Sequence, residues 1–317
     1  MASITDGVAL VVRYSDGQDF SQFQRAGDLI LDTARRTSLS LRAAVPGSRR
    51  VAAVIAAVLI TGCGGVGPEP VAGKKMTVTY RDATSAEAIR GRALMMDARL
   101  LEDVAEDVND SLKLPEDVAL VADQCGKANA AWNSAQREIK ICYELAELNL
   151  RLFEEDPEHE HAHPGHRDTV PTQAAVNATI GVFFHELGHA VISLYDLPIT
   201  GREEDVADQL AAYAILEPDD VLKQFPNAAG VAGDYALMFK KWAADRDWVT
   251  PADFAAVHSL SETRMFNLKC WIYGSDPAGH ADMVADGSLP ESRAAGCPEE
   301  YQRLSRAWFT LLAPHLK

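Results

Sequence analysis

Residues 172–194 read TQAAVNATIGVFFHELGHAVISL, and this stretch decides the fold of the chain. It contains no proline and two glycines, and its apolar residues recur at three- and four-residue spacing, which predicts a long buried helix. Within it, residues 185–189 read HELGH, with two histidines four positions apart. Side chains four residues apart project from the same side of a helix. The stretch therefore predicts one helix that presents His185, Glu186 and His189 together.

This HExxH spacing is suited to a zinc site. Two imidazoles on one helix face can bind a single Zn²⁺ ion, and the glutamate after the first histidine faces the open coordination position. There Glu186 can take a proton from water whose pKa zinc lowers to about 7, and pass it to a leaving amine. An uncompensated histidine beside Phe183 and Phe184 would be costly to bury without metal. We expect His185 and His189 to be zinc ligands and Glu186 to be the general base.

The third ligand is expected from a second helix at about residues 203–216, whose first turn is acidic. Glu204 is the preferred ligand, because Asp208 lies one turn later on the same face and can orient a ligating histidine. Ligation by Asp205 or Asp208 is the competing assignment. A further alternative is that these acidic residues only complement the positive end of the helix.

HExxH on one helix, with ExxAD at residues 204–208 on the next, resembles the gluzincin zinc peptidases. The resemblance implies an α+β, zincin-like fold, with a small N-terminal mixed sheet over the HExxH helix and a mostly helical C-terminal part. It also implies hydrolysis of peptide bonds in a peptide or protein substrate, with Zn²⁺ as the cofactor.

A second likeness lies upstream, at residues 129–132, which read NAAW. This segment is similar to the Asn-Ala-aromatic edge strand with which neprilysin and thermolysin bind substrate. The likeness implies that Asn129 and Ala130 bind the substrate backbone, as an extended peptide adds to a sheet edge. Ala131 departs from the aromatic residue that is usual there, and a turn cap is the alternative role for Asn129.

The stretch from Cys125 to about Cys297 is similar to an uncharacterised bacterial family labelled "putative metallopeptidases". The likeness is carried by residues 142–145, 185–197 and 271–277. It bears on the fold and the site more than on the substrate. Four residues with suitable donors are candidates for stabilising a transition-state oxyanion: Tyr143, Tyr213, His258 and Tyr273.

Elsewhere the patterns predict short strands and further helices. Strands are expected at residues 76–80, 118–121, 128–132 and 138–142, the last two around a polar turn. Helical spacing marks residues 86–108 and 143–153, and the chain after residue 219 is expected to be mostly helical, with breaks at prolines. Residues 154–168 form a charged segment with four histidines, interpreted as a solvated insertion rather than a metal site.

The N-terminal region is interpreted as an export signal that follows a start site assigned too early. Arg49 and Arg50 precede the apolar run 51–60, which is shorter than the roughly twenty residues of a membrane-spanning helix. Residues 60–63, Ile-Thr-Gly-Cys, resemble the bacterial lipobox. This resemblance implies a lipid anchor on Cys63 and a lipoprotein on the outer side of the cytoplasmic membrane, in the cell envelope.

These observations divide the chain into four parts. Residues 1–44 are a misassigned or disordered extension, 45–62 the signal peptide, 63–75 a flexible tether rich in glycine and proline, and 76–317 the zincin-like domain. The alternatives are a genuine cytosolic extension at 1–44 and a buried apolar helix at 51–60.

Four cysteines remain if Cys63 is lipidated, and an even number suits an oxidising compartment. Three pairings are possible for Cys125, Cys142, Cys270 and Cys297. Joining neighbours in sequence closes the shortest loops, and reduced buried thiols are the alternative.

The formal net charge of −16 in 317 residues argues against a nucleic-acid partner, because phosphate binding relies on clustered Lys and Arg. The sequence therefore predicts a zinc metalloendopeptidase. Two other functions are kept: a non-catalytic zincin-like lipoprotein with a structural or partner-binding role, and a protein of zinc binding or delivery. Substrate identity and oligomeric state do not follow from the sequence.

Overall fold

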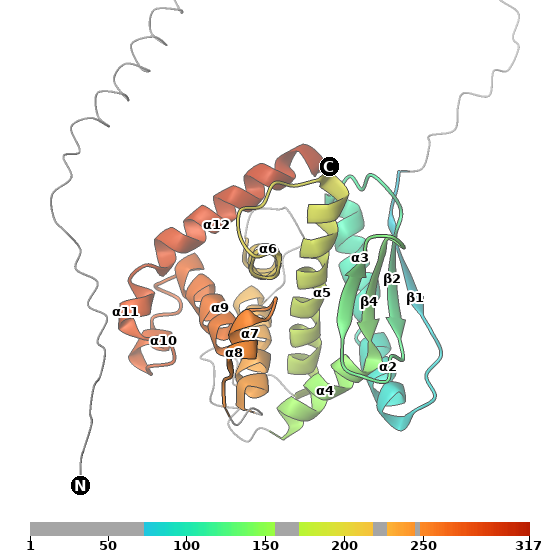
Figure 1. Ribbon diagram of the computed structural model, residues 1–317, viewed down its shortest axis with the longest axis horizontal. Coiled ribbons are helices and arrows are strands. Elements are labelled where there is room, and N and C mark those ends of the chain that lie inside the picture. Colours follow the sequence, from blue (N-terminus) through green and yellow to red (C-terminus); the bar gives the residue numbers. More distant parts are fainter. Residues whose placement is uncertain (1–72, 156–170, 218–226, 245–247) are drawn as a thin grey trace, which may run out of the picture. The chain divides into compact units, whose positions relative to one another are not determined.

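The computed structural model describes residues 73–155, 171–217, 227–244 and 248–317 (Figure 1). The predicted signal, Cys63 and most of the histidine-rich segment lie outside these ranges. No helix in the described ranges is long and apolar enough to cross a membrane.

A four-stranded mixed sheet forms the N-terminal layer, in the order β1-β2-β4-β3. β1 (Met76–Tyr80) runs parallel to β2 (Val118–Asp123), and β2 runs parallel to β4 (Glu138–Cys142). β3 (Ala130–Asn133) returns antiparallel beside β4 and forms one edge of the sheet. The short strands predicted from alternation are therefore confirmed, and the mixed sheet belongs to an α+β fold.

The helical region predicted at residues 86–108 is two helices, α2 (Ala86–Asp97) and α3 (Leu100–Ser111). Ser85 caps α2 by accepting a hydrogen bond from the Ala88 N–H. Arg99 has φ 53°, a left-handed conformation that ends the first helix before the second begins. No glycine or proline marks this break, and the apolar spacing continues across it. The sequence pattern therefore predicted one helix where the structure has two.

The HExxH stretch is the 25-residue helix α5 (Pro171–Tyr195), which lies between the sheet layer and the C-terminal helices (Figure 1). α4 (Tyr143–Glu154) joins the sheet to it. The mostly helical C-terminal part is confirmed and comprises α6 (Glu203–Leu216), α7 (Ala228–Ala244), α8 (Pro251–Ala255), α9 (Ser261–Ser275), α10 (Asp282–Ala285), α11 (Glu291–Ala294), α12 (Cys297–Leu312) and the 3-10 turn η2 (Ala313–His315).

Small residues let α5 pack closely against its neighbours. A Cβ on Gly188 would lie 2.8 Å from the Cα of Ala207 on α6, and a Cβ on Gly181 would overlap the Tyr235 ring on α7. Backbone cannot move aside as a flexible side chain can, so glycine is required at position 188. The close approach brings the HExxH face of α5 against the acidic start of α6.

Two disulfides link neighbours in sequence, Cys125 with Cys142 and Cys270 with Cys297. The first joins the loop before β3 to the end of β4, and the second joins α9 to the start of α12. This pairing is the one that closes the shortest loops, so reduced thiols are not found at these four positions.

Candidate metal centre and active site

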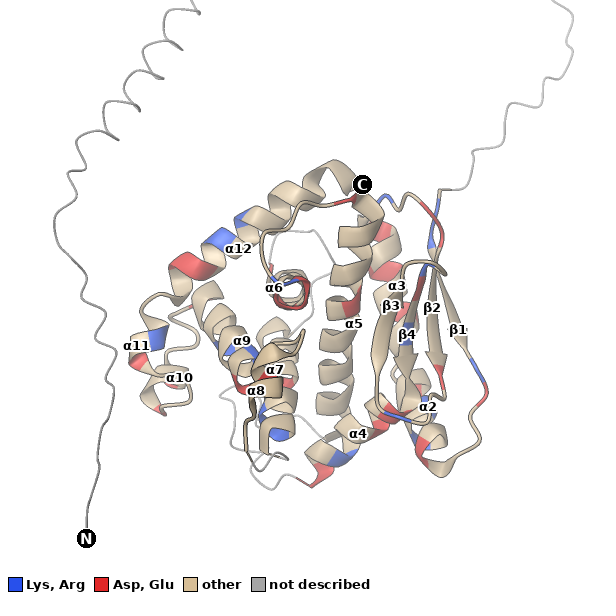
Figure 2. Cartoon of the chain, in the orientation of Figure 1, with Lys and Arg blue, Asp and Glu red and all other residues tan. Residues whose placement is uncertain are grey.

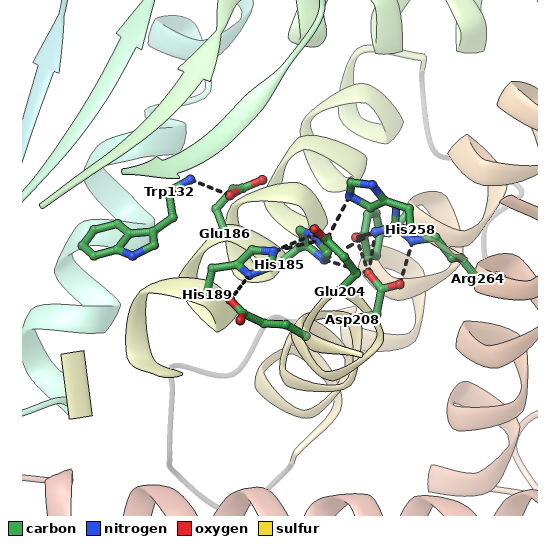
Figure 3. Close-up of polar contacts among 10 residues, drawn as sticks. Trp132, His185, Glu186, His189, Glu204, Asp208, His258 and Arg264 are labelled. Carbon is green, nitrogen blue, oxygen red and sulfur yellow. Dashed lines mark hydrogen bonds and ion pairs between the residues drawn. The ribbon is translucent and has the colours of Figure 1, made fainter. Parts of the chain in front are cut away.

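The two HExxH histidines and Glu204 converge on one point between α5 and α6 (Figure 3). The Nε2 atoms of His185 and His189 are 3.3 Å apart. Oε2 of Glu204 lies 3.1 Å from the first and 3.3 Å from the second. One nitrogen or oxygen atom from each residue lies within 4.8 Å of the other two. The predicted ligands are therefore brought together, with one ligand atom each facing the others.

A carboxylate occupies the opposite nitrogen of each imidazole. Nδ1 of His185 lies 2.8 Å from Oδ1 of Asp208, and Nδ1 of His189 lies 2.8 Å from Oε1 of Glu203. A carboxylate at Nδ1 holds the proton there and leaves the Nε2 lone pair free for a metal. Asp208 thus stands at the orienting position rather than among the converging atoms. Glu203 has the same relation to His189, although its acidic first-turn position suggested only a helix-end effect.

The electrostatics of this cluster favour a cation. Burial lowers the pKa of His185, but hydrogen bonds to Asp208 and Glu204 outweigh it and raise the pKa to about 9. Burial alone would raise the pKa of Glu204, but hydrogen bonds from His185, His189 and His258 hold it far below its usual range. The same carboxylates that attract a proton to the imidazoles attract a divalent ion in its place.

Asp208 is fixed by a buried network that sequence reasoning missed. Arg264 on α9 donates from Nε to Oδ2 at 2.7 Å and from a terminal nitrogen to Oδ1 at 2.6 Å. Tyr235 on α7 donates to Oδ1 at 3.1 Å. The Arg264 guanidinium also lies 4.1 Å from the centre of the Phe239 ring. Burial opposes the Asp208 charge, but Arg264 and His185 lower the pKa of this carboxyl well below its usual range.

Glu186 is the single acidic residue of α5, and that helix carries no Lys or Arg (Figure 2). Its side chain faces the sheet, where Oε2 accepts a hydrogen bond of 2.8 Å from the backbone N–H of Trp132 in β3 (Figure 3). Burial raises the pKa of this carboxyl against the opposing effect of the two nearby histidines. A backbone donor leaves no mark on side-chain patterns, so this contact could not be predicted from the sequence.

The cluster opens into a cleft of about 710 Å³ lined by β3, α5, the start of α6 and residues 255–258. β3 offers its free edge to this cleft. Alternate residues of an edge strand turn their backbone groups to opposite sides, and the Trp132 N–H faces Glu186, so Ala130 and Trp132 point their backbone groups outward.

The backbone carbonyl of Asn129 points toward β4, whereas the backbone groups of Ala130 point away from it. The Asn129 carbonyl accepts a hydrogen bond from the Cys142 N–H at 3.0 Å and so belongs to the ladder with β4. Asn129 and Ala130 both line an adjoining cavity of about 540 Å³. Of the pair named from the sequence, Ala130 is the residue placed to offer its backbone to an extended chain.

Of the four oxyanion candidates, His258 lines the cleft and the three tyrosines do not. The His258 Nε2 lies 2.8 Å from Oε2 of Glu204, and the side chain is 49% exposed. Tyr143 donates its hydroxyl to the Arg81 carbonyl at 2.6 Å, away from the cleft. Only the folded chain could distinguish these residues, because each is separated from HExxH by segments of unrelated length.

The donor set fits a zinc ion. Two imidazole nitrogens with carboxylates behind them and one carboxylate oxygen are the ligands that zinc takes when one coordination position stays open. When each neutral imidazole keeps its proton on Nδ1 beside a carboxylate, neither Nε2 atom can donate to the other, and two lone pairs face each other 3.3 Å apart. A cation between them satisfies both lone pairs.

A family described as "Putative metallopeptidase" matches residues 80–312 of the chain. The match includes β3, the converging histidines, Glu204 and Arg264. No curated protein and no solved structure matches the chain.

Proposed function

The chain belongs to this "putative metallopeptidase" family, and from that premise we propose that it cuts peptide bonds with one zinc ion held by His185, His189 and Glu204. The family implies a metal ion and a peptide substrate. One observation carries the finer proposal: two imidazoles held by carboxylates converge with Glu204, while the buried Glu186 stands beside them at the cleft.

Glu186 acts as the general base. Zinc held there supplies Lewis acidity, which acidifies water and polarises the carbonyl of the substrate. Glu186 receives the water proton on its carboxylate and later delivers it to the leaving nitrogen. The Trp132 N–H holds this carboxylate on the side of the substrate edge. The side chain is therefore oriented before substrate arrives.

The free edge of β3 binds the substrate backbone. An extended peptide aligned with this edge meets the outward backbone groups of Ala130 and the outward carbonyl of Trp132, while the Trp132 N–H stays bonded to Glu186. In that arrangement we expect a peptide carbonyl to lie near the metal ligands and Glu186. The arrangement also requires an extended substrate, so we propose unstructured or locally unfolded polypeptides as the class cut.

His258 supplies the second electrophile. It stands at the cleft beside Glu204, on the segment after α8, with its imidazole partly in solvent. From there it donates a hydrogen bond to the oxyanion that forms when water adds to the carbonyl. We assign the site to the gluzincin type because Glu204 is the third converging ligand and Asp208 stands behind His185.

The decisive experiment measures hydrolysis of unstructured fluorogenic peptides by the wild type, Glu186→Gln and a surface control, Glu299→Gln. We expect Glu186→Gln to lose at least about 100-fold in turnover while bound zinc stays at one ion per chain. The control should match the wild type, because Glu299 is exposed and its ion pair with Arg303 lies in solvent. Undiminished turnover by Glu186→Gln would exclude the mechanism.

Zinc content and hydrolysis, measured on the wild type, distinguish the two other functions from peptidase activity. Zinc at one ion per chain with no chelator-sensitive hydrolysis of any peptide points to the non-catalytic role. More than one zinc per chain, with the excess lost on deletion of residues 157–167, points to zinc delivery. We expect neither result.

A further inference from the structure

Exposed apolar side chains are concentrated in one short segment beside the metal cleft, residues 248–257, which we call the apolar segment. Four of its large apolar side chains are exposed: Trp248, Val249, Phe254 and Val257. Phe254 is 62% exposed and Val257 is 69% exposed. The other exposed large apolar side chains of the described ranges lie on α2 and α12. Single exposed apolar residues are normal, but several in one short segment indicate a surface that contacts a partner.

The stability of the fold does not account for these side chains. The apolar segment contains α8, and no residue of α8 is buried. The start of α8 is closed instead by Thr250 and Asp253. The Asp253 carboxylate accepts hydrogen bonds from the Thr250 N–H at 2.7 Å and from its hydroxyl at 2.6 Å. Since the turn is held by these polar contacts, the apolar surface at Phe254 and Val257 is available to a partner.

The apolar segment continues into the wall of the metal cleft. Its last three residues, Ala255, Ala256 and Val257, line the cleft and lead directly to His258. The free edge of β3 lines the same cleft. A polypeptide extended along β3 therefore passes the apolar segment. Successive side chains of an extended chain point to opposite faces, so every second one can turn toward this segment.

The charge of this region favours a polypeptide over a lipid surface. The apolar segment contains no Lys or Arg and a single acidic residue, Asp253. Glu203 and Glu204 line the adjoining cleft, and the chain carries a formal net charge of −16. Segments that bind anionic membranes carry Lys and Arg beside their apolar residues. Apolar side chains of a polypeptide need no such charge in order to bind.

We propose that the apolar segment binds apolar side chains of the polypeptide being cut, at positions outside the peptide bond that lies at the metal. This inference rests on the proposed peptidase function, and it narrows the substrate class. Folded proteins bury most of their leucine and aromatic side chains, whereas unfolded chains expose them beside free backbone. The β3 edge binds the backbone and the apolar segment binds the side chains. The substrates are therefore unfolded polypeptides rich in apolar residues, not hydrophilic linkers.

The test measures hydrolysis of two fluorogenic peptides with the same central sequence, one with leucine and phenylalanine in its flanks and one with serine in their place. We expect a KM about tenfold lower for the apolar peptide, because it buries exposed side chains. Phe254→Ser should remove this advantage, with kcat unchanged. Phe309→Ser is the matched control, since it removes the same ring, 54% exposed, from a helix outside the cleft lining. It should leave both KM values unchanged.

A binding measurement keeps this inference separate from the proposed catalysis. Fluorescence anisotropy follows the labelled apolar peptide with Glu186→Gln and with the double variant Glu186→Gln, Phe254→Ser. We expect about tenfold weaker binding by the double variant. If the wild type cuts no peptide, the peptidase proposal fails, and this loss of binding still supports a polypeptide site. If hydrolysis is normal and Phe254→Ser has no effect on either peptide, only the present inference fails.

Other results would also overturn the inference. One is an equal effect of Phe254→Ser and Phe309→Ser on the apolar peptide. Another is a dimer in sedimentation that Phe254→Ser dissociates, which would assign the apolar segment to a second copy of the chain. A third is flotation with vesicles of phosphatidylcholine and phosphatidylglycerol that Phe254→Ser abolishes, which would assign the segment to a lipid surface. If Phe254→Ser melts well below the wild type, Val257→Ser replaces it with the same expected loss.

Discussion

Behind the wall of the cleft formed by α5 and α6 lies a buried network of polar side chains, whereas the wall formed by β3 and residues 255–258 presents backbone groups and a half-exposed imidazole to the cleft. Asp208 and His185 are 3% and 4% exposed, while the His258 side chain is 49% exposed. The buried wall is held by charged hydrogen bonds among α5, α6 and α9. The open wall offers backbone groups and one imidazole.

This difference indicates that the two walls have different roles. Charged hydrogen bonds away from water are strong and directional, so they fix atoms to within a small tolerance. A free strand edge instead binds any extended backbone, whatever its side chains. Changes in the buried wall should therefore lower stability and metal affinity. Changes in the open wall should alter kinetics and leave the metal in place.

Arg264→Met should have the largest effect. It leaves the buried Asp208 carboxylate without its cation, and breaking a buried pair costs about 3–5 kcal/mol. Urea unfolding of the metal-free protein measures the loss. Arg303→Met is the control, because its pair with Glu299 is exposed and should contribute less than about 1 kcal/mol. Equal effects of the two variants would remove the contrast between the walls.

His258→Leu should come next, with its main effect on turnover, because leucine has no hydrogen-bond donor. Losing one oxyanion donor lowers kcat by about 10²–10³-fold, or about 3–4 kcal/mol. KM, melting temperature and the zinc bound at saturation should stay near wild-type values, because the side chain is half exposed and Glu204 keeps its contacts with His185 and His189. His280→Leu, away from the cleft lining, serves as the control. A kcat within twofold of the wild type would contradict the assigned role.

Gly188→Ala tests how closely α5 and α6 must approach. Alanine is the better helix former by about 1 kcal/mol, so propensity alone predicts a gain in stability. The added Cβ meets the Ala207 backbone at 2.8 Å, and overpacking costs about 1–3 kcal/mol, so we expect a net loss. Zinc affinity should fall with it.

Gly201→Ala is the matched control for that variant, since its Cβ has an ordinary nearest contact of 3.6 Å. Urea unfolding and competition with a zinc indicator follow both proteins. A gain in stability at position 188 would show that the two helices can separate without harm to the site.

Ala130→Pro should have the smallest effect. Proline removes an N–H that faces the cleft and leaves the ladder to β4 intact, as edge strands tolerate. One lost hydrogen bond to substrate is worth about 1 kcal/mol, so KM should rise about fivefold at unchanged kcat. Ala131→Ser, which keeps the edge N–H groups, should leave KM unchanged. A fall in kcat or in zinc content would contradict the division between the walls.

The sequence by itself determined the features that depend on short-range spacing. Four-residue periodicity placed His185 and His189 on one helix face, and the same rule put Glu204 and Asp208 together on the next helix. Alternation located the strands, and loop length favoured the observed cysteine pairing. Such features follow from backbone geometry over a few residues, which is the same wherever the segment lies.

Only the tertiary structure decided which distant groups complete the site. Arg264 lies 56 residues after Asp208, and the Trp132 N–H lies 54 residues before Glu186. Which residues meet over such separations depends on how whole helices and strands pack, and no local period encodes it. Packing also decided the helix break at Arg99. It likewise decided that His258, and none of the three tyrosines, lines the cleft.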